Sequence, residues 1–301
     1  MEAGLPSPED LALIRSEAAR LAGEAGELVT EYFRRPLEVR FKSDKGDSDP
    51  VTQADEASER FLREAILSRF PGHAVLGEEG RDVAGDASSA WVWVLDPVDG
   101  TTNYLNGLAL FGVSVGVLHL GRPVAGAIYL PSGVVAAPVV VHAAVGQGAA
   151  CADEPIVRED RAGSGARIGG VPGGGMRRFR GPAPAGVRLG EPRVLGSISY
   201  EMALVALGVL QYAIFARPRI WDVAAGAVIV REAGGSVLTQ QAGRWAPLDG
   251  FGTSSSAADG LDLREWRAPV VAGDGDVAAY LTMSIPQPPG LVRRMLSRFG
   301  R

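Results

Sequence analysis

Cysteine and histidine are both scarce in this chain of 301 residues. It has one cysteine, Cys151, and three histidines, His73, His119 and His142. A single thiol excludes an internal disulfide and a cysteine-cluster zinc site, and the histidines do not have the spacing of a zinc motif. Any metal would therefore have to be held by oxygen ligands. The lone thiol is compatible with the reducing cytoplasm that we predict for the protein.

Long apolar runs and an excess of positive charge are missing as well. The N-terminal segment has no apolar stretch typical of a signal peptide, and no run elsewhere is long enough to span a bilayer. The formal net charge is −5. We therefore expect no nucleic acid polymer and no membrane among the partners. The acidity also indicates that cations, rather than basic side chains, handle an anionic substrate.

The hydrophobic content of 46% is enough for a sizeable core. Apolar spacing predicts helices from Ser7 to Tyr32 and over Thr52–Phe70, Tyr200–Leu210 and Asp222–Ala233. Runs of apolar residues predict strands over 91–95, 111–120, 124–130, 134–141, 212–215, 236–239 and 269–272. The segment 154–192 is rich in Gly, Pro and Arg and is predicted to be mainly irregular.

The most informative stretch is Asp-Pro-Val-Asp-Gly-Thr-Thr-Asn, residues 96–103, which follows the first apolar strand. Asp96 and Asp99 flank Pro97, and Gly100 follows, so a turn can aim both carboxylates at one point. Two anions so close repel each other unless a cation or a proton intervenes, and hard oxygen ligands favour Mg²⁺. The backbone N–H groups after Gly100 would suit a phosphate. An Asx-turn with a capping aspartate is the structural alternative for the bare D-x-x-D-G pattern.

Three shorter acidic stretches each have an ordinary structural explanation. Gly-Glu-Glu-Gly around Glu78 fits a charged surface turn. The run from Asp49 to Asp55 fits a helix cap, and Asp222, within Trp-Asp-Val-Ala-Ala-Gly, fits an N-cap residue. The joint occurrence of all four stretches, in this order, argues strongly against chance.

Taken together, these stretches resemble the inositol monophosphatase family of lithium-sensitive, metal-dependent phosphatases. The resemblance is carried by Asp49 before V-T-x-x-D, by the G-E-E at Glu78, by D-P-x-D-G-T-x-N from Asp96 and by W-D-x-A-A-G at Asp222. It implies a layered α/β and α+β sandwich (αβαβα), like inositol monophosphatase and fructose-1,6-bisphosphatase. It divides the chain into an α+β half, 1–145, an α/β half, 146–285, and a basic tail, 286–301.

The resemblance also implies a Mg²⁺-dependent phosphatase that hydrolyses a small phosphorylated metabolite as a homodimer. It assigns the ligands of two or three Mg²⁺ ions to Glu78, Asp96, the carbonyl of Val98, Asp99 and Asp222. It assigns activation of the attacking water to the catalytic residues Asp49, Thr101 and Glu78. The substrate would lie against Gly100, Thr101, Thr102 and Phe215. Such metal ions bridge the phosphate and stabilise the leaving oxygen.

The chain departs from the family pattern where the substrate ring would lie. Phe215 stands six positions before Trp221, where members that prefer inositol phosphates have an acidic residue, and Gln211 stands where an aspartate is common. A phenylalanine cannot accept a hydroxyl hydrogen bond, but it could stack on a base or an imidazole, or pack in the core. The alternatives are therefore a 3′(2′),5′-bisphosphate nucleotidase or a histidinol-phosphatase. A non-catalytic metal-binding homologue is the alternative outside enzymology.

Overall fold

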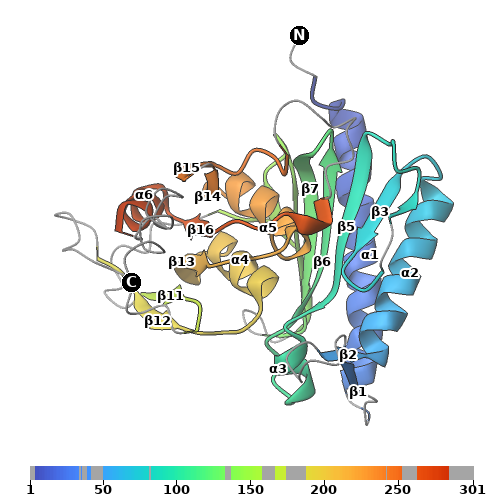
Figure 1. The fold of residues 1–301 in the computed structure, drawn as a ribbon, viewed down its shortest axis with the longest axis horizontal. Helices are drawn as coiled ribbons and strands as arrows, with labels where there is room; N and C mark the ends of the chain where they lie inside the picture. Colours follow the sequence, from blue (N-terminus) through green and yellow to red (C-terminus); the bar gives the residue numbers. More distant parts are fainter. Residues whose placement is uncertain are drawn as a thin grey trace, which may run out of the picture.

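The computed structural model describes residues 4–33, 35, 39–41, 50–80, 83–132, 137–157, 167–173, 188–241, 243–252 and 263–284. Two predicted features, the catalytic residue Asp49 and the basic tail 286–301, lie outside these residues. In the described part of the chain, helices and sheets alternate in five layers (Figure 1). The prediction of a layered αβαβα sandwich is confirmed.

The first sheet is built from consecutive stretches of the N-terminal half. Within the described residues its order is β10-β9-β8-β7-β6-β5-β3-β4, and the only parallel pair is β3 with β5. The strands are β3 (Ala74–Gly77), β4 (Ala84–Gly85), β5 (Trp91–Asp99), β6 (Gly112–His119), β7 (Arg122–Leu130), β8 (Val139–Ala144), β9 (Ala149–Cys151) and β10 (Glu154–Pro155). A separate pair joins β1 (Val39–Phe41) to β2 (Pro50–Thr52).

Two long helices, α1 (Pro8–Phe33) and α2 (Gln53–Arg69), cover the outer face of this sheet (Figure 1). Both start directly after Ser7 and Thr52, the residues from which the sequence predicts the two helices. The Ser7 hydroxyl accepts a hydrogen bond from the Asp10 N–H at 3.1 Å, and Thr52 and Asp55 cap α2 reciprocally. The apolar faces of both helices and the outer sheet face form one continuous core cluster.

The helices α4 (Ile198–Ala206) and α5 (Ile220–Glu232) fill the space between the two sheets. The second sheet has the order β12-β11-β13-β16-β14-β15 in the described residues. Its strands are β11 (Ile168–Gly170), β12 (Glu191–Arg193), β13 (Leu210–Phe215), β14 (Ser236–Gln241), β15 (Arg244–Pro247) and β16 (Val270–Gly273). The outermost helix, α6 (Gly275–Ser284), packs on its far face; α3 (Thr101–Leu105) and the 3₁₀ turn η3 (Leu263–Glu265) are short connectors.

Several element bounds differ from the prediction. The helix expected over 200–210 ends at Ala206, because Gly208 adopts a φ of +70° and Leu210 already begins β13. The strand expected over 134–141 is observed as β8, and residues 133–136 lie outside the described part. The first sheet continues to Pro155, and the division of the chain after residue 145 stays a prediction. No helix among the described residues is long and apolar enough to cross a bilayer.

Candidate active site

The aspartates of residues 96–103 end the buried strand β5. Its pairing with β6 is interrupted between Asp96 and Asp99, and Gly100 follows with a φ of +93°. A Cβ atom at Gly100 would lie 2.9 Å from the Cβ atom of Ser197, so neither the backbone conformation nor the space suits a side chain. The strand therefore turns sharply after Asp99, and the short helix α3 begins at Thr101.

Side-chain hydrogen bonds hold this turn in place. The Thr101 hydroxyl donates to the carbonyl oxygen of Val98 at 3.0 Å. The amide of Asn103 donates to the carbonyl oxygens of Leu110 and Leu195, at 2.7 and 2.6 Å. The turn is thus tied both to its own strand and to the segment that precedes α4.

Asp99 is oriented by the start of α4. Its Oδ2 accepts a hydrogen bond from the hydroxyl of Ser197 at 2.8 Å and another from the backbone N–H of Ser199. The Ser197 hydroxyl also caps α4 by accepting from the Tyr200 N–H at 3.3 Å. One carboxylate oxygen of Asp99 is therefore fixed by the helix start, which orients the other.

Glu78 is brought beside Asp96 by the parallel strand pair. In β3 and β5, Gly77 lies opposite Leu95, and the Glu78 N–H donates to the Leu95 carbonyl oxygen at 3.1 Å. Because the carboxyl ends of parallel strands meet at the same sheet edge, the residues that follow them are neighbours. The separate motifs around Glu78 and Asp96 thus converge on one edge.

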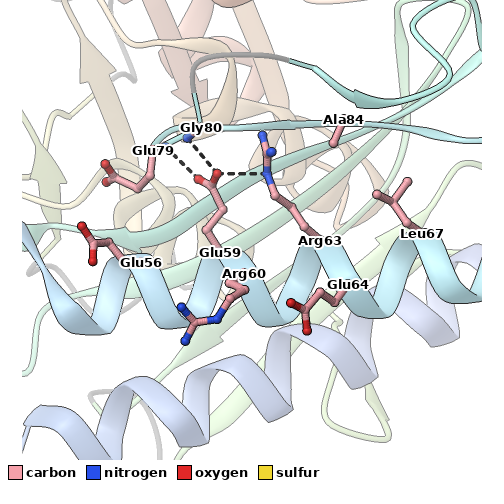
Figure 2. Close-up of a pocket in the computed structure, with 9 residues that line it drawn as sticks. All are labelled: Glu56, Glu59, Arg60, Arg63, Glu64, Leu67, Glu79, Gly80 and Ala84. Carbon is pink, nitrogen blue, oxygen red and sulfur yellow. Dashed lines mark hydrogen bonds and ion pairs between the residues drawn. The ribbon is translucent and has the colours of Figure 1, made fainter.

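The turn that carries Glu78 is also held from α2. The carboxylate of Glu59 accepts from the N–H groups of Glu79 and Gly80, at 2.7 and 2.8 Å, and pairs with Arg63 at 3.0 Å (Figure 2). Glu59 is only 4% exposed. Figure 2 shows that these groups line a pocket between α2 and the turn, where the helix presents both acidic and basic side chains. We assign Glu59 a structural role, because its carboxylate is bonded to the turn and to Arg63.

Asp222 reaches the same edge because α5 packs very closely on the first sheet. A Cβ atom at Gly116 would lie 2.7 Å from the Cβ of Ala224, and one at Gly126 would lie 2.5 Å from the Cα of Ala225. Glycine on the strands and alanine on the helix therefore permit the contact. Asp222 lies in the first turn of α5, where its Oδ2 accepts from the Arg219 N–H at 2.7 Å.

The carboxylates at this edge, Glu78, Asp96, Asp99 and Asp222, form a group that we call the acidic edge. Burial raises the pKa of Asp96 well above its ordinary value, and the charges of Glu78, Asp99 and Asp222 raise it further. Burial also raises the pKa of Asp222, with Asp99 the next cause. For Asp99, burial again raises the pKa, while the hydrogen bonds from Ser199 and Ser197 oppose the rise. The acidic edge is thus a site of concentrated, mutually repelling negative charge.

The acidic edge suits a hard divalent cation. The Oδ1 atom of Asp96 is buried and has no hydrogen-bond donor within the described residues. Across those residues, no three His, Cys, Asp or Glu side chains form a group that could hold a metal by themselves. The acidic edge offers the hard carboxylate oxygens that Mg²⁺ prefers, and Mg²⁺ completes its shell with water and phosphate oxygens. The acidic edge does not suit zinc, which is held by closed sets of nitrogen and sulfur ligands.

Comparison with known proteins decides the family. The profile of the inositol monophosphatase family matches residues 10–271. The chain is 36% identical over 250 residues to the chloroplastic phosphatase IMPL1 of Arabidopsis thaliana, covering 77% of this chain and 64% of that relative. It is 33% identical over 229 residues to the fructose-1,6-bisphosphatase/inositol-1-monophosphatase of Aquifex aeolicus, covering 73% and 83%.

The chain belongs to the inositol monophosphatase family. A staphylococcal member, SaIMPase-II, has been solved with inositol monophosphate and with 2′AMP bound. Its inositol monophosphate complex matches this fold with a TM-score of 0.67 and 26% identity, covering 95% of this chain and all of that one. The predictions of an inositol monophosphatase fold and of a phosphoric monoester hydrolase are confirmed.

Phe215 does not share the polar surroundings of the acidic edge. Its ring is 5% exposed and lies in the core cluster between the two sheets. Gln211 on the same strand accepts from the Gly190 N–H at 2.8 Å and donates to the Arg188 carbonyl at 3.0 Å. Both departures from the pattern of inositol monophosphatases therefore support the second sheet, which favours the core-packing alternative for Phe215.

Sequence reasoning identified the acidic residues of this site but not the residues that orient them. Ser197, Ser199 and Glu59 were not singled out. Ser197 could have been found, because Gly-Ser before an apolar helix is a common N-cap signal. Glu59 could not, because its bonds to the turn after β3 join segments that are far apart in the sequence.

Proposed function

We propose that this protein hydrolyses a small phosphate monoester of the inositol monophosphate kind with Mg²⁺ as its metal. The observation that carries the proposal is the buried Oδ1 of Asp96, which has no donor among the described residues, within the acidic edge. A buried anionic oxygen without a donor is costly unless a cation compensates it. The complexes of SaIMPase-II support the substrate class, because both of its bound molecules are small phosphate monoesters.

The proposed ligands of two or three Mg²⁺ ions are Glu78, Asp96, Asp99, Asp222 and the carbonyl oxygen of Val98. When bound, Mg²⁺ neutralises phosphate charge and lowers the pKa of a coordinated water. The protein contributes orientation: the start of α4 fixes Asp99, and the close packing of α5 on the sheet sets the depth of Asp222.

Activation of the water is proposed to fall to Thr101, Asp49 and Glu78. The Thr101 hydroxyl donates its hydrogen bond to the Val98 carbonyl oxygen. The hydroxyl oxygen can therefore accept a hydrogen bond from a water molecule. Asp49 would then receive the proton of that water, in the role that the family resemblance gives it. The phosphate is proposed to bind the N–H groups of Gly100, Thr101 and Thr102, where the chain turns into α3.

Phe215 is not carried into the proposed substrate site. The nucleotidase and histidinol-phosphatase alternatives relied on its ring stacking against a base or an imidazole. A ring that is 5% exposed within the core offers no face for such stacking. The inositol monophosphate class therefore stands as the single proposed substrate class.

We also propose that the protein forms a homodimer and that it is located in the cytoplasm. The family resemblance supports a homodimer, which light scattering after size-exclusion chromatography would test. The single cysteine is compatible with a reducing cytoplasm, and cell fractionation would test that location. We expect no nucleic acid polymer and no membrane as a partner, because the formal net charge is −5.

The decisive experiment measures phosphate release from inositol 1-phosphate, 2′AMP, histidinol phosphate, fructose 1,6-bisphosphate and adenosine 3′,5′-bisphosphate. Each is assayed with Mg²⁺, with EDTA and with the Asp96→Asn variant. Asp86→Asn is the matched control, because Asp86 is exposed and its carboxylate accepts hydrogen bonds from Ser88. We expect turnover of inositol 1-phosphate that requires Mg²⁺, survives in the control and is lost in Asp96→Asn. No Mg²⁺-dependent turnover of any substrate would contradict the proposal.

A further inference from the structure

An arginine from a distant part of the chain binds the turn that carries Glu78. Arg264, in η3, donates from Nη2 to the carbonyl oxygen of Gly77 at 2.5 Å and from Nη1 to that of Glu78 at 3.2 Å. Its Nη2 also donates to the carbonyl oxygen of Gly80. A planar guanidinium presents its donors in a fixed fork, so it can bridge several carbonyls with little loss of side-chain freedom.

The same guanidinium contacts the start of α5. Its central carbon lies 5.4 Å from the ring centroid of Trp221, the residue before Asp222. The guanidinium carbon of Arg219 lies at the same 5.4 Å from that ring, and Arg219 donates to the Arg264 carbonyl oxygen at 3.0 Å. Trp221 therefore has cation–π contacts with two arginines that are also bonded to each other.

Arg264 is itself well anchored. Two residues later, the ring of Trp266 meets that of Phe251 edge-on, with 4.9 Å between centroids, and Phe251 is fully buried. Leu263 and Trp266 both pack against the core between the sheets. The guanidinium therefore projects from a support that belongs to the second half of the chain, while the carbonyls that it binds belong to the first sheet.

The turn is thus held from two directions. Glu59 on α2 accepts from its N–H groups (Figure 2), and Arg264 donates to its carbonyl groups. Glu78 needs such support, because it lies in a turn beyond β3 and faces the repelling charges of Asp96 and Asp222. Arg264 binds the backbone of the turn, so these bonds stiffen it without occupying the Glu78 carboxylate.

We propose that Arg264 is a positioning residue that fixes Glu78 relative to Asp222, and thereby sets the affinity of the acidic edge for Mg²⁺. The inference rests on the proposed function, since it concerns the metal of that same site. Residues that orient metal ligands typically change metal affinity about 10–100-fold when they are replaced. Arg264 would act in that way across the junction between the first sheet and α5.

The test measures Mg²⁺ binding by calorimetry without substrate, together with the Mg²⁺-induced rise in Tm. Arg264→Met keeps most of the side-chain volume and removes every donor, and Arg264→Lys keeps the charge but not the fork. We expect the Kd for Mg²⁺ to rise about 10-fold in Arg264→Met and by a smaller factor in Arg264→Lys. In phosphatase assays the half-saturating Mg²⁺ concentration should rise in parallel, while kcat at saturating Mg²⁺ falls much less.

Arg231→Met is the matched control. Arg231 also donates to three carbonyl oxygens, those of Ala227, Leu248 and Pro123, but at the other end of α5. This variant should lower Tm and leave the Kd within two-fold of wild type. If Arg264→Met does not fold, Arg264→Lys and Arg231→Lys provide the same comparison.

The outcomes distinguish failure of the positioning role of Arg264 from failure of the proposed metal site. A Kd that stays within two-fold in the Arg264 variants, with a Tm loss like that of the control, would overturn the positioning role and leave the proposed function intact. Absence of Mg²⁺ binding by the wild-type protein would instead overturn the proposed metal site, and this inference with it.

Discussion

In the part of the chain that the structure describes, buried polar groups are left partly without hydrogen bonds at the acidic edge of the first sheet, but are fully hydrogen-bonded on strand β13 of the second sheet. At the acidic edge, charges of one sign are gathered, and within the described residues one buried oxygen of Asp96 has no donor. On β13, Gln211 is 8% exposed and both ends of its amide are bonded, while Phe215 fills the core. Unsatisfied buried charge lowers stability, whereas satisfied groups support it. The comparison indicates that the first region is shaped by binding and the second by folding.

The largest effect is expected for Asp96→Asn. Removing the most buried charge of the acidic edge should lower kcat about 10³-fold, because several kcal/mol of charge stabilisation depend on the bound cation. In EDTA, the same change should raise the free energy of unfolding, since it relieves repulsion among Glu78, Asp99 and Asp222. Phosphate release and urea denaturation measure the two effects.

The matched change on β13 is Gln211→Leu. It should lower stability by about 1–3 kcal/mol, because the Gly190 N–H and the Arg188 carbonyl lose their partner. It should leave the Kd for Mg²⁺ unchanged. A stability loss in both variants would contradict the contrast between the two regions.

A second prediction concerns the packing that carries Asp222 to the edge. Gly126→Ala would place a methyl group about where the Ala225 backbone lies, because the added Cβ would be 2.5 Å from its Cα. We expect the free energy of unfolding to fall by about 2–3 kcal/mol, and Mg²⁺ to bind several-fold more weakly as α5 moves. Gly23→Ala on α1 is the control, since its added methyl group would meet only Val140, at 3.5 Å. Equal effects in the two variants would show that close packing of α5 is not required.

The motifs made the acidic edge predictable, because each acidic residue follows or begins an element that the apolar pattern reveals. Asp96 follows the apolar run of β5, and Asp222 lies just inside a helix whose spacing is clear. The layered fold followed from the family resemblance that these motifs carry. By contrast, the bonds of Glu59 and Arg264 to the turn after β3 depend on long-range folding and have no local signal. The role of Phe215 was ambiguous in the sequence because an aromatic residue suits both a core and a ligand site.

A third prediction concerns a buried acid that is not a proposed ligand, although the charge of Asp99 also helps to raise its pKa. Glu201, on α4, is 5% exposed, and burial raises its pKa to about 8 from an ordinary value of 4.5. The folded carboxyl group thus stays protonated at pH values where the unfolded one has ionised. Because the unfolded state then binds fewer protons, stability falls as pH rises from 4.5 to about 8. Glu201→Gln should remove this dependence and raise the free energy of unfolding by about 2–4 kcal/mol at pH 8.

Urea denaturation at pH 4 and pH 8 measures this effect. At pH 4 the variant and the wild-type protein should have nearly equal stability, because the carboxyl group is largely protonated in both states. Glu154→Gln, at an exposed position, should follow the wild-type curve at both pH values. A Glu201→Gln curve parallel to that of wild type would mean that burial of this carboxyl group does not drive the pH dependence.

The smallest effect is expected at Phe215, where the chain departs from the family pattern. Phe215→Leu should cost about 1–1.5 kcal/mol of stability, as expected for a shortened core side chain. Its KM for inositol 1-phosphate should stay within two-fold of wild type, because a ring that is 5% exposed has no face to offer a substrate. Denaturation and steady-state kinetics measure the two quantities.

Leu210→Val, at the other end of β13, is the matched truncation, because Leu210 is fully buried in the same core cluster. If Phe215 only packs, the two variants should lose similar stability and share an unchanged KM. A KM that rises ten-fold in Phe215→Leu and not in Leu210→Val would place the Phe215 ring against the substrate. The end of β13 would then belong with the acidic edge, and the division between a binding region and a folding region would run through this strand rather than between the sheets.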